Sequence, residues 1–237
     1  DNLVVEADII AGENVALEAG NNMTLGDTLG GGSTQTGVII AGNSLDVNAV
    51  ERSTVSIEAG GDVLDGNGED MSDNNSDGIA DGVNVVAHST AGDASAATRS
   101  GDLVVTSGGS FGEADFTNPA APAGDAVEAE IGRVAGISGG DFNLEDVSGD
   151  LHVVEGLNTL KTPEINPING VSAAEDICID ASDINGASLF VDADITADDL
   201  AAGTINNIAL AANDNVVLGD MAGSQNGVVR AGAVKFF

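Results

Sequence analysis

The chain carries the stretch Asn14-Val15-Ala16-Leu17-Glu18-Ala19-Gly20-Asn21-Asn22-Met23-Thr24-Leu25-Gly26-Asp27 near its beginning. The stretch returns without a gap as Asn207-Ile208-Ala209-Leu210-Ala211-Ala212-Asn213-Asp214-Asn215-Val216-Val217-Leu218-Gly219-Asp220. The Ala-Leu pair and the closing Leu-Gly-Asp are unchanged between the two copies. Self-similarity of this length is typical of repeat proteins, in which each unit buries its apolar edge on the next.

The similarity extends on both sides of this stretch. Residues 3–11 resemble residues 189–197, and Gly37–Gly42 resembles Gly227–Gly232. We therefore interpret residues 189–237 as a restart of the repeat seen at 3–42. The pattern predicts one continuous array over residues 1–237, which stacks end to end on adjacent repeats or on other copies of itself.

Short apolar alternations bounded by Gly, Asn and Asp recur through most of the chain. Val15–Ala19 and Val55–Ala59 are examples, and period-2 alternation of this kind indicates strands. Such short, similar strands predict an all-β chain folded as a parallel β-helix, or β-solenoid. The alternative is a series of tandem β-sandwich domains, which usually carry longer strands and an anchoring Trp or Tyr. Only residues 126–134 and 196–202 have a weakly helical pattern.

Three segments interrupt the alternation and are predicted to be loops inserted into the array, at about 61–82, 108–125 and 156–170. The first is rich in Asp, Asn and Gly, and the other two contain all four prolines. Proline cannot donate a hydrogen bond to an interior strand ladder, so these segments should leave the sheets.

The charge of the chain limits its partners. It has 39 acidic and 6 basic residues, so binding to nucleic acid or to anionic lipid through phosphate neutralisation is excluded. No stretch is long and apolar enough to insert into a membrane. The single cysteine, Cys178, cannot form a disulfide within the chain, and the alternation around it predicts a buried thiol on the inner face of a strand.

Four segments together resemble the repeats of filamentous-haemagglutinin-like exoproteins and giant bacterial surface adhesins. They begin Val55-Ser-Ile-Glu-Ala-Gly-Gly-Asp, Val83-Asn-Val-Val-Ala, Gly101-Asp-Leu-Val-Val-Thr and Gly140-Asp-Phe-Asn-Leu-Glu-Asp. The resemblance covers most of the chain but rests on repeat texture and not on an invariant motif. It implies a right-handed parallel β-helix that is extracellular or at the cell surface and serves in adhesion or as a filament.

The most specific local motif is a D-x-N-x-D-G-x-x-D sequence between residues 73 and 81. Asp73, Asn75 and Asp77 supply oxygen ligands at alternate positions, and Asp81 follows the Gly that makes the tight turn. This arrangement predicts Ca²⁺ binding, and it resembles the short calcium repeats of thrombospondin-type and dockerin-type modules.

The closing ligand of this loop must come from elsewhere, because position 12 of the motif is Asn84 and not Glu. Asp65 and Asn67 precede the loop and could supply that ligand or a second site. The competing interpretation is a solvated acidic turn in a chain that is acidic throughout.

Catalytic residues are not evident in the sequence. His88 and His152 are the only histidines, and no G-x-S-x-G phrase marks a nucleophile. We therefore expect a non-enzymatic protein, with a glycan-binding or glycan-cleaving β-helix as the alternative. That alternative needs cell-surface or matrix glycans as partners and a groove lined by acids together with Phe111, Phe116 or Phe190.

Overall fold

The computed structural model describes residues 1–26, 37–42, 52–66, 79, 82–89, 101–116, 123–160, 167–182, 185–197, 206–219 and 227–236. These residues form strands and turns without a helix, which confirms the predicted all-β class. No helix in this part of the chain is long and apolar enough to cross a membrane. The weakly helical pattern at 126–134 was misleading, because Val127–Glu130 and Arg133–Ser138 are strands. Residues 195–197 are also a strand.

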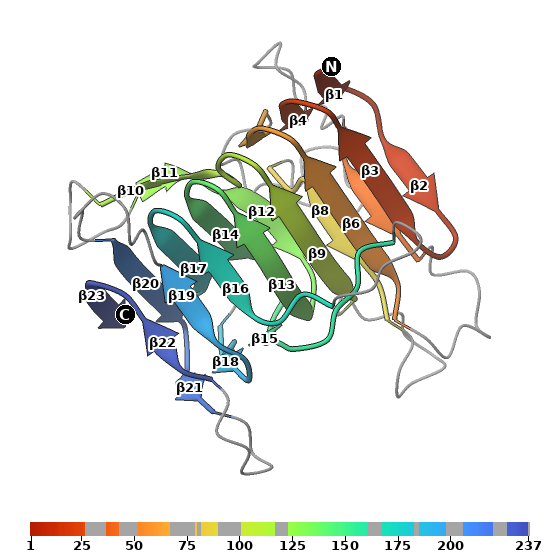
Figure 1. Ribbon diagram of the computed structural model, residues 1–237. Coiled ribbons are helices and arrows are strands. Elements are labelled where there is room, and N and C mark those ends of the chain that lie inside the picture. The colour runs from red at the N-terminus through yellow and green to blue at the C-terminus, as the bar shows by residue number, and fades with distance from the viewer. Residues whose placement is uncertain are drawn as a thin grey trace.

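Most of the strands pair in parallel, as the sequence predicts, in long ladders that Figure 1 shows as a stack of arrows. A three-stranded sheet has the order β1 (Leu3–Val5), β4 (Met23–Leu25), β7 (Val63–Asp65). An eight-stranded sheet has the order β2 (Ile9–Ala11), β5 (Ile39–Ala41), β8 (Val85–Ala87), β12 (Val127–Glu130), β14 (Phe142–Asp146), β17 (Ile177–Ala181), β20 (Asn207–Ala212), β23 (Ala233–Phe236).

A third sheet begins with long strands and then divides. Its long strands are β3 (Val15–Ala19), β6 (Thr54–Ala59), β9 (Asp102–Ser107) and β13 (Arg133–Ser138). One end of β13 pairs with β15 (Leu151–Val153), followed by β18 (Leu189–Val191) and β21 (Val216–Leu218). Its other end pairs with β16 (Val171–Ala173), followed by β19 (Ile195–Ala197) and β22 (Val229–Arg230).

The described parts of the three predicted insert loops contain some regular structure. The first contains β7, and the second contains the antiparallel pair β10 (Glu113–Asp115) and β11 (Ala123–Asp125). In the third, Leu157 and Ile168 form an antiparallel bridge.

The hydrophobic core is a set of apolar columns that follow the ladders. Val15, Val55 and Leu103 stand in one column, and the last two are fully buried. Each fully buried Val or Leu side chain contributes roughly 1.5–3 kcal/mol relative to an exposed one. Because inward and outward residues alternate, a slip of one residue would expose a whole column, so the core fixes the register.

A polar column stabilises one corner of the stack. The chain returns to this corner once in every pass along the stack. In each pass, the backbone N–H of one residue donates to the side-chain oxygen of the residue that holds the same place one pass earlier. The members are Asn22, Asp62, Ser110, Asp141, Asp176 and Asn207. The column explains the recurring Gly-Gly-Asp phrase: a Cβ on Gly61 or Gly140 would collide with the side chain of Asn22 or Ser110.

The two copies of the repeat have the same strand pairing but lie in different sheets. Leu3 pairs with Met23 as Leu189 pairs with Val216, and Ile9 pairs with Ile39 as Ile195 pairs with Val229. However, β3 belongs to the divided sheet, whereas its counterpart β20 belongs to the eight-stranded sheet.

The exchange of sheets arises where β13 is followed directly by β14. Before β13, two three-residue strands precede each long strand, as β4 and β5 precede β6. After β14, two three-residue strands again separate long ones, as β15 and β16 separate β14 from β17. Because the long strands β13 and β14 follow one another directly, the second copy of the repeat is rotated about the stacking direction relative to the first copy.

Candidate functional site

The predicted calcium loop lies between two residues that contact each other. Asp65 is the last residue of β7, and Asn84 precedes β8. The fully buried Asn84 donates from Nδ2 to Asp65 Oδ1 over 2.8 Å, while its Oδ1 accepts from the backbone N of Glu128 over 3.0 Å. Among the predicted metal ligands, only Asp65 is described; the others, Asn67, Asp73, Asn75, Asp77 and Asp81, lie outside the described residues.

Glu128 is the least expected side chain near this point. It is fully buried, and neither of its carboxylate oxygens has a hydrogen-bond partner in the described structure. Burial, followed by the nearby charge of Asp65, raises the pKa of Glu128 to about 9. The carboxyl group is therefore neutral at pH 7, because an unpaired buried carboxylate would carry a large desolvation cost.

Glu128 begins a column of carboxyl groups on the outer face of the eight-stranded sheet. Glu128 pairs in register with Glu145 on β14, and Glu145 pairs with Asp180 on β17. Neighbouring strands lie about 4.8 Å apart, so like charges in such a column repel one another. Because Glu128 is buried and neutral, only Glu145 and Asp180 can present charge on this face.

The described residues do not by themselves form a metal centre. In the ranges that the structure describes, no group of three or more His, Cys, Asp or Glu side chains is placed to hold a metal ion. A calcium site here would need ligands from the 65–81 segment, so Ca²⁺ binding remains a prediction.

A second buried carboxyl group, that of Asp146, is held by hydrogen bonds from neighbouring residues. Burial raises its pKa to about 7, although hydrogen bonds from the backbone N of Ile131 (3.1 Å) and the hydroxyl of Ser148 (3.0 Å) act in the opposite direction. These bonds fix the turn between β12 and β13, which accounts for the position of Asp146 without a ligand.

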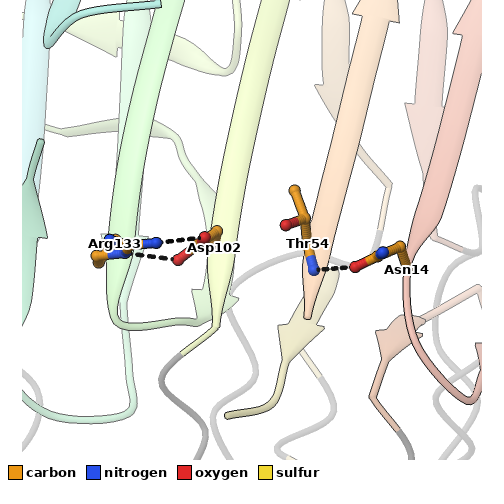
Figure 2. Close-up of polar contacts among 4 residues, drawn as sticks. All are labelled: Asn14, Thr54, Asp102 and Arg133. Atoms are coloured by element: carbon orange, nitrogen blue, oxygen red, sulfur yellow. Dashed lines mark hydrogen bonds and ion pairs between the residues drawn. The ribbon is translucent and has the colours of Figure 1, made fainter. Parts of the chain in front are cut away.

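A polar row crosses the divided sheet at the beginning of its long strands, and Figure 2 shows four of its members. The guanidinium of Arg133 donates from Nε and Nη2 to the two carboxylate oxygens of Asp102 over 2.7 and 2.6 Å. Nearby, Asn14 Oδ1 accepts from the backbone N of Thr54 over 2.8 Å. Asp102 is buried, and the ion pair raises the pKa of Arg133.

The row continues to His152, which pairs in register with Arg133. His152 Nδ1 lies 2.7 Å from Asp192 Oδ2, and its ring stacks on Phe190 with centroids 4.5 Å apart. Sequence reasoning did not find this row. Its signal is the shared position of these residues relative to the strands, which becomes visible only when the register is known.

The three phenylalanines named for a glycan platform do not lie together on one exposed surface. Phe111 is fully buried and packs against Phe142, with ring centroids 4.9 Å apart. One ring face of Phe190 is covered by His152. Phe116 is partly exposed.

The prediction that Cys178 faces inward was wrong. Ile177 and Ile179 are fully buried in the core, so Cys178 between them points outward and is partly exposed. Burial, together with Asp180 and Glu145, raises its pKa to about 12. The thiol is therefore protonated at neutral pH and a poor nucleophile.

Both ends of the stack leave strand edges unpaired within the described part of the chain. These edges are β1, β2 and β3 at one end and β21, β22 and β23 at the other. Leu218 and Phe236 stand over the core residues Val191 and Leu210, yet they are 49% and 51% exposed. The core therefore reaches the surface at the end formed by β21–β23.

No known protein family, curated protein or solved structure matches this chain.

Proposed function

We propose that this chain is a segment of a structural or adhesive rod that acts outside the cell or at the cell surface. Its strands form a parallel β-solenoid, in which each pass of the chain stacks on the one before. The observation that carries this proposal is the unbroken parallel ladder from β2 to β23. Backbone hydrogen bonds along such a ladder make a stiff body, and each pass contacts mainly its neighbours.

The exposed ends support an assembly role. A long unpaired strand edge is a template for pairing with another chain, and natural proteins usually cover it. Here three edges and an open core coincide at the end formed by β21–β23. The rod is therefore extended by adjacent repeats or by other copies. The role that we propose is structural and not catalytic.

Calcium is the cofactor that we assign to this rod. The support is the D-x-N-x-D-G-x-x-D motif together with the Asn84–Asp65 contact, which holds the two ends of the segment close to each other. The carboxyl groups of Glu145 and Asp180, which pair in register, add negative charge on a nearby face. Bound Ca²⁺ lowers the repulsion in a chain with a net charge of −33.

Negative-stain electron microscopy tests the proposal. Purified protein in CaCl₂ should form rods or filaments, and a chelator should shorten or dissolve them. Compact, monodisperse particles that do not respond to the chelator would refute both self-assembly and the structural role of calcium. The glycan-active alternative gains no support from the described phenylalanines, because Phe111 is buried and Phe190 is stacked on His152.

A further inference from the structure

We infer that a second copy of this chain docks with its β1, β2 and β3 on β21, β22 and β23 of the first, in one defined register. This inference rests on the proposed rod function and specifies its interface. It gives the assembly a heterologous, head-to-tail geometry, which does not close and therefore builds filaments.

The order of strand lengths at the two ends supports this docking. The last pass presents two short strands and then a four-residue strand, β21, β22 and β23. The first pass presents two short strands and then a five-residue strand, β1, β2 and β3. Only one rotation of the second copy about the stacking direction places its two short strands on the two short strands of the first copy and its longer strand on the longer strand.

The second copy must be turned about the stacking direction to reach this setting. At the first end β2 lies in the eight-stranded sheet and β3 in the divided sheet, whereas at the last end β23 lies in the eight-stranded sheet and β22 in the divided one. The chain already makes this turn internally, where β14 follows β13. At that point the long β13 pairs with both β15 and β16, whereas the inferred docking pairs short strands with short strands, as β18 and β19 pair with β21 and β22.

The register follows from the inward positions. Val216 and Val229 pack against the core, and so do Leu3 and Ile9. When the core-facing residues of the two copies are aligned in common columns, Leu3 lies on Val216 and Ile9 lies on Val229.

The same alternation places Leu17 on Phe236, because Phe236 occupies the column of Leu210. It also sets Val4 opposite Val217, and both of these residues are outward-facing, since Val217 pairs with Phe190.

The charges of the two ends differ. The first pass is acidic, whereas the last pass, residues 214–236, contains Arg230 and Lys235 together with Asp214 and Asp220. Residues 1–26 contain five acidic residues (Asp1, Glu6, Asp8, Glu13 and Glu18) and no basic one. Residues 227–236 contain Arg230 and Lys235 and no acidic residue. Arg230 already pairs with Asp194, whose counterpart in the first copy of the repeat is Asp8. This difference favours head-to-tail encounters over encounters between two acidic first ends.

Site-specific disulfides test the register. In a Cys178→Ser background, one protein carries Val4→Cys and a second carries Val217→Cys. In the inferred register their Cα atoms lie about 4.8 Å apart, within the range of about 4.4–6.8 Å that a disulfide spans. The matched control pairs Val217→Cys with Ile137→Cys, because Ile137 is outward and 46% exposed but lies in the middle of the stack.

We expect the mixture of Val4→Cys and Val217→Cys to form a covalent dimer at least about tenfold faster than the control mixture, and than either protein alone. Equal rates for the two mixtures would overturn the register. Rapid dimerisation of Val217→Cys alone would also overturn it, because like ends would then meet. Electron microscopy of the same samples separates the two proposals: rods without the preferred cross-link refute the register alone, and the absence of rods refutes the rod function as well.

Discussion

The side-chain amide of Asn84 donates a 2.8 Å hydrogen bond to Asp65 and joins the two strands between which the predicted calcium loop runs. The same amide lies 3.4 Å from the carbonyl oxygen of Leu25, and its oxygen accepts from the backbone N of Glu128. The buried side chain of Asn84 thus links three passes of the stack at the point where the acidic 65–81 segment begins.

Asn84→Ala should destabilise the fold more than an ordinary Asn→Ala change. It leaves the buried backbone N–H of Glu128 without its side-chain acceptor and removes a hydrogen bond to the half-buried Asp65, which together cost about 1–3 kcal/mol. The free energy of unfolding in urea measures the effect. The control is Asn21→Ala, whose amide makes an exposed bond to Asn2 and should change stability by about 0.5 kcal/mol or less. Equal losses in the two variants would show that Asn84 does not link the passes.

Stability should fall as pH rises because of Glu128. In the folded state its pKa is raised from 4.5 to about 9, so between these values the folded chain holds a proton that the unfolded chain has lost. The group therefore lowers the free energy of unfolding with increasing pH, by at most about 1.4 kcal/mol per pH unit. Below pH 4.5 this penalty is absent.

Glu128→Gln should remove that dependence, because the amide stays neutral. Denaturant titrations from pH 4 to pH 9 should show the variant gaining stability relative to the parent as pH rises. Glu175→Gln, at an exposed site, serves as the control and should follow the parent. Parallel curves for the parent and Glu128→Gln would mean that the carboxyl group is ionised in the folded state.

The calcium prediction is tested on the motif itself. Saturating Ca²⁺ should stabilise the parent, by about 2.7 kcal/mol at a hundred times the dissociation constant, because the ion binds only the folded chain. Asp77→Ala should abolish this gain by removing the ligand at the centre of the motif. Asp214→Ala, an exposed acid far along the chain, controls for the loss of one charge. If both variants respond to Ca²⁺ like the parent, the ion acts through general screening and not at this loop.

The Arg133–Asp102 pair should contribute more than the exposed Arg230–Asp194 pair. The Asp102 side chain is 7% exposed and accepts hydrogen bonds through both oxygens. Replacing Arg133 therefore leaves the buried charge of Asp102 without this ion pair. Double-mutant cycles with Arg→Gln and Asp→Asn should give a coupling of about 1.5–3 kcal/mol for the first pair and about 0–1 kcal/mol for the second. Similar couplings would mean that solvent screens both pairs alike.

The strands were predictable from the sequence because their signal is local. Val15–Ala19 and Val55–Ala59 alternate with period 2 and end in Gly, so neither strand needs its neighbours to be recognised. At 126–134 the local signal misled, because Ala and Glu favour helices, whereas pairing of β12 with β8 and β14 overrides that preference.

The candidate site was less predictable because it depends on the register. Glu128 is one of 39 acidic residues, and only its position between β8 and β14 distinguishes it. The alternation around Cys178 was visible, but choosing the inner face requires knowing that Ile177 and Ile179 fill the core. Asp65 was named because it precedes the motif in the sequence, but its contact with Asn84 could not be predicted.

Phe236→Asp should weaken end-to-end assembly while leaving the single chain folded. Phe236 stands over the open core at 51% exposure, so a carboxylate there removes apolar contact and faces the acidic first pass of the next copy. Ile137→Asp adds the same charge at a site of 46% exposure in the middle of the stack and should leave assembly unchanged. Sedimentation velocity in CaCl₂ should show smaller species for Phe236→Asp only. If both variants sediment alike, total charge controls association and the open end does not.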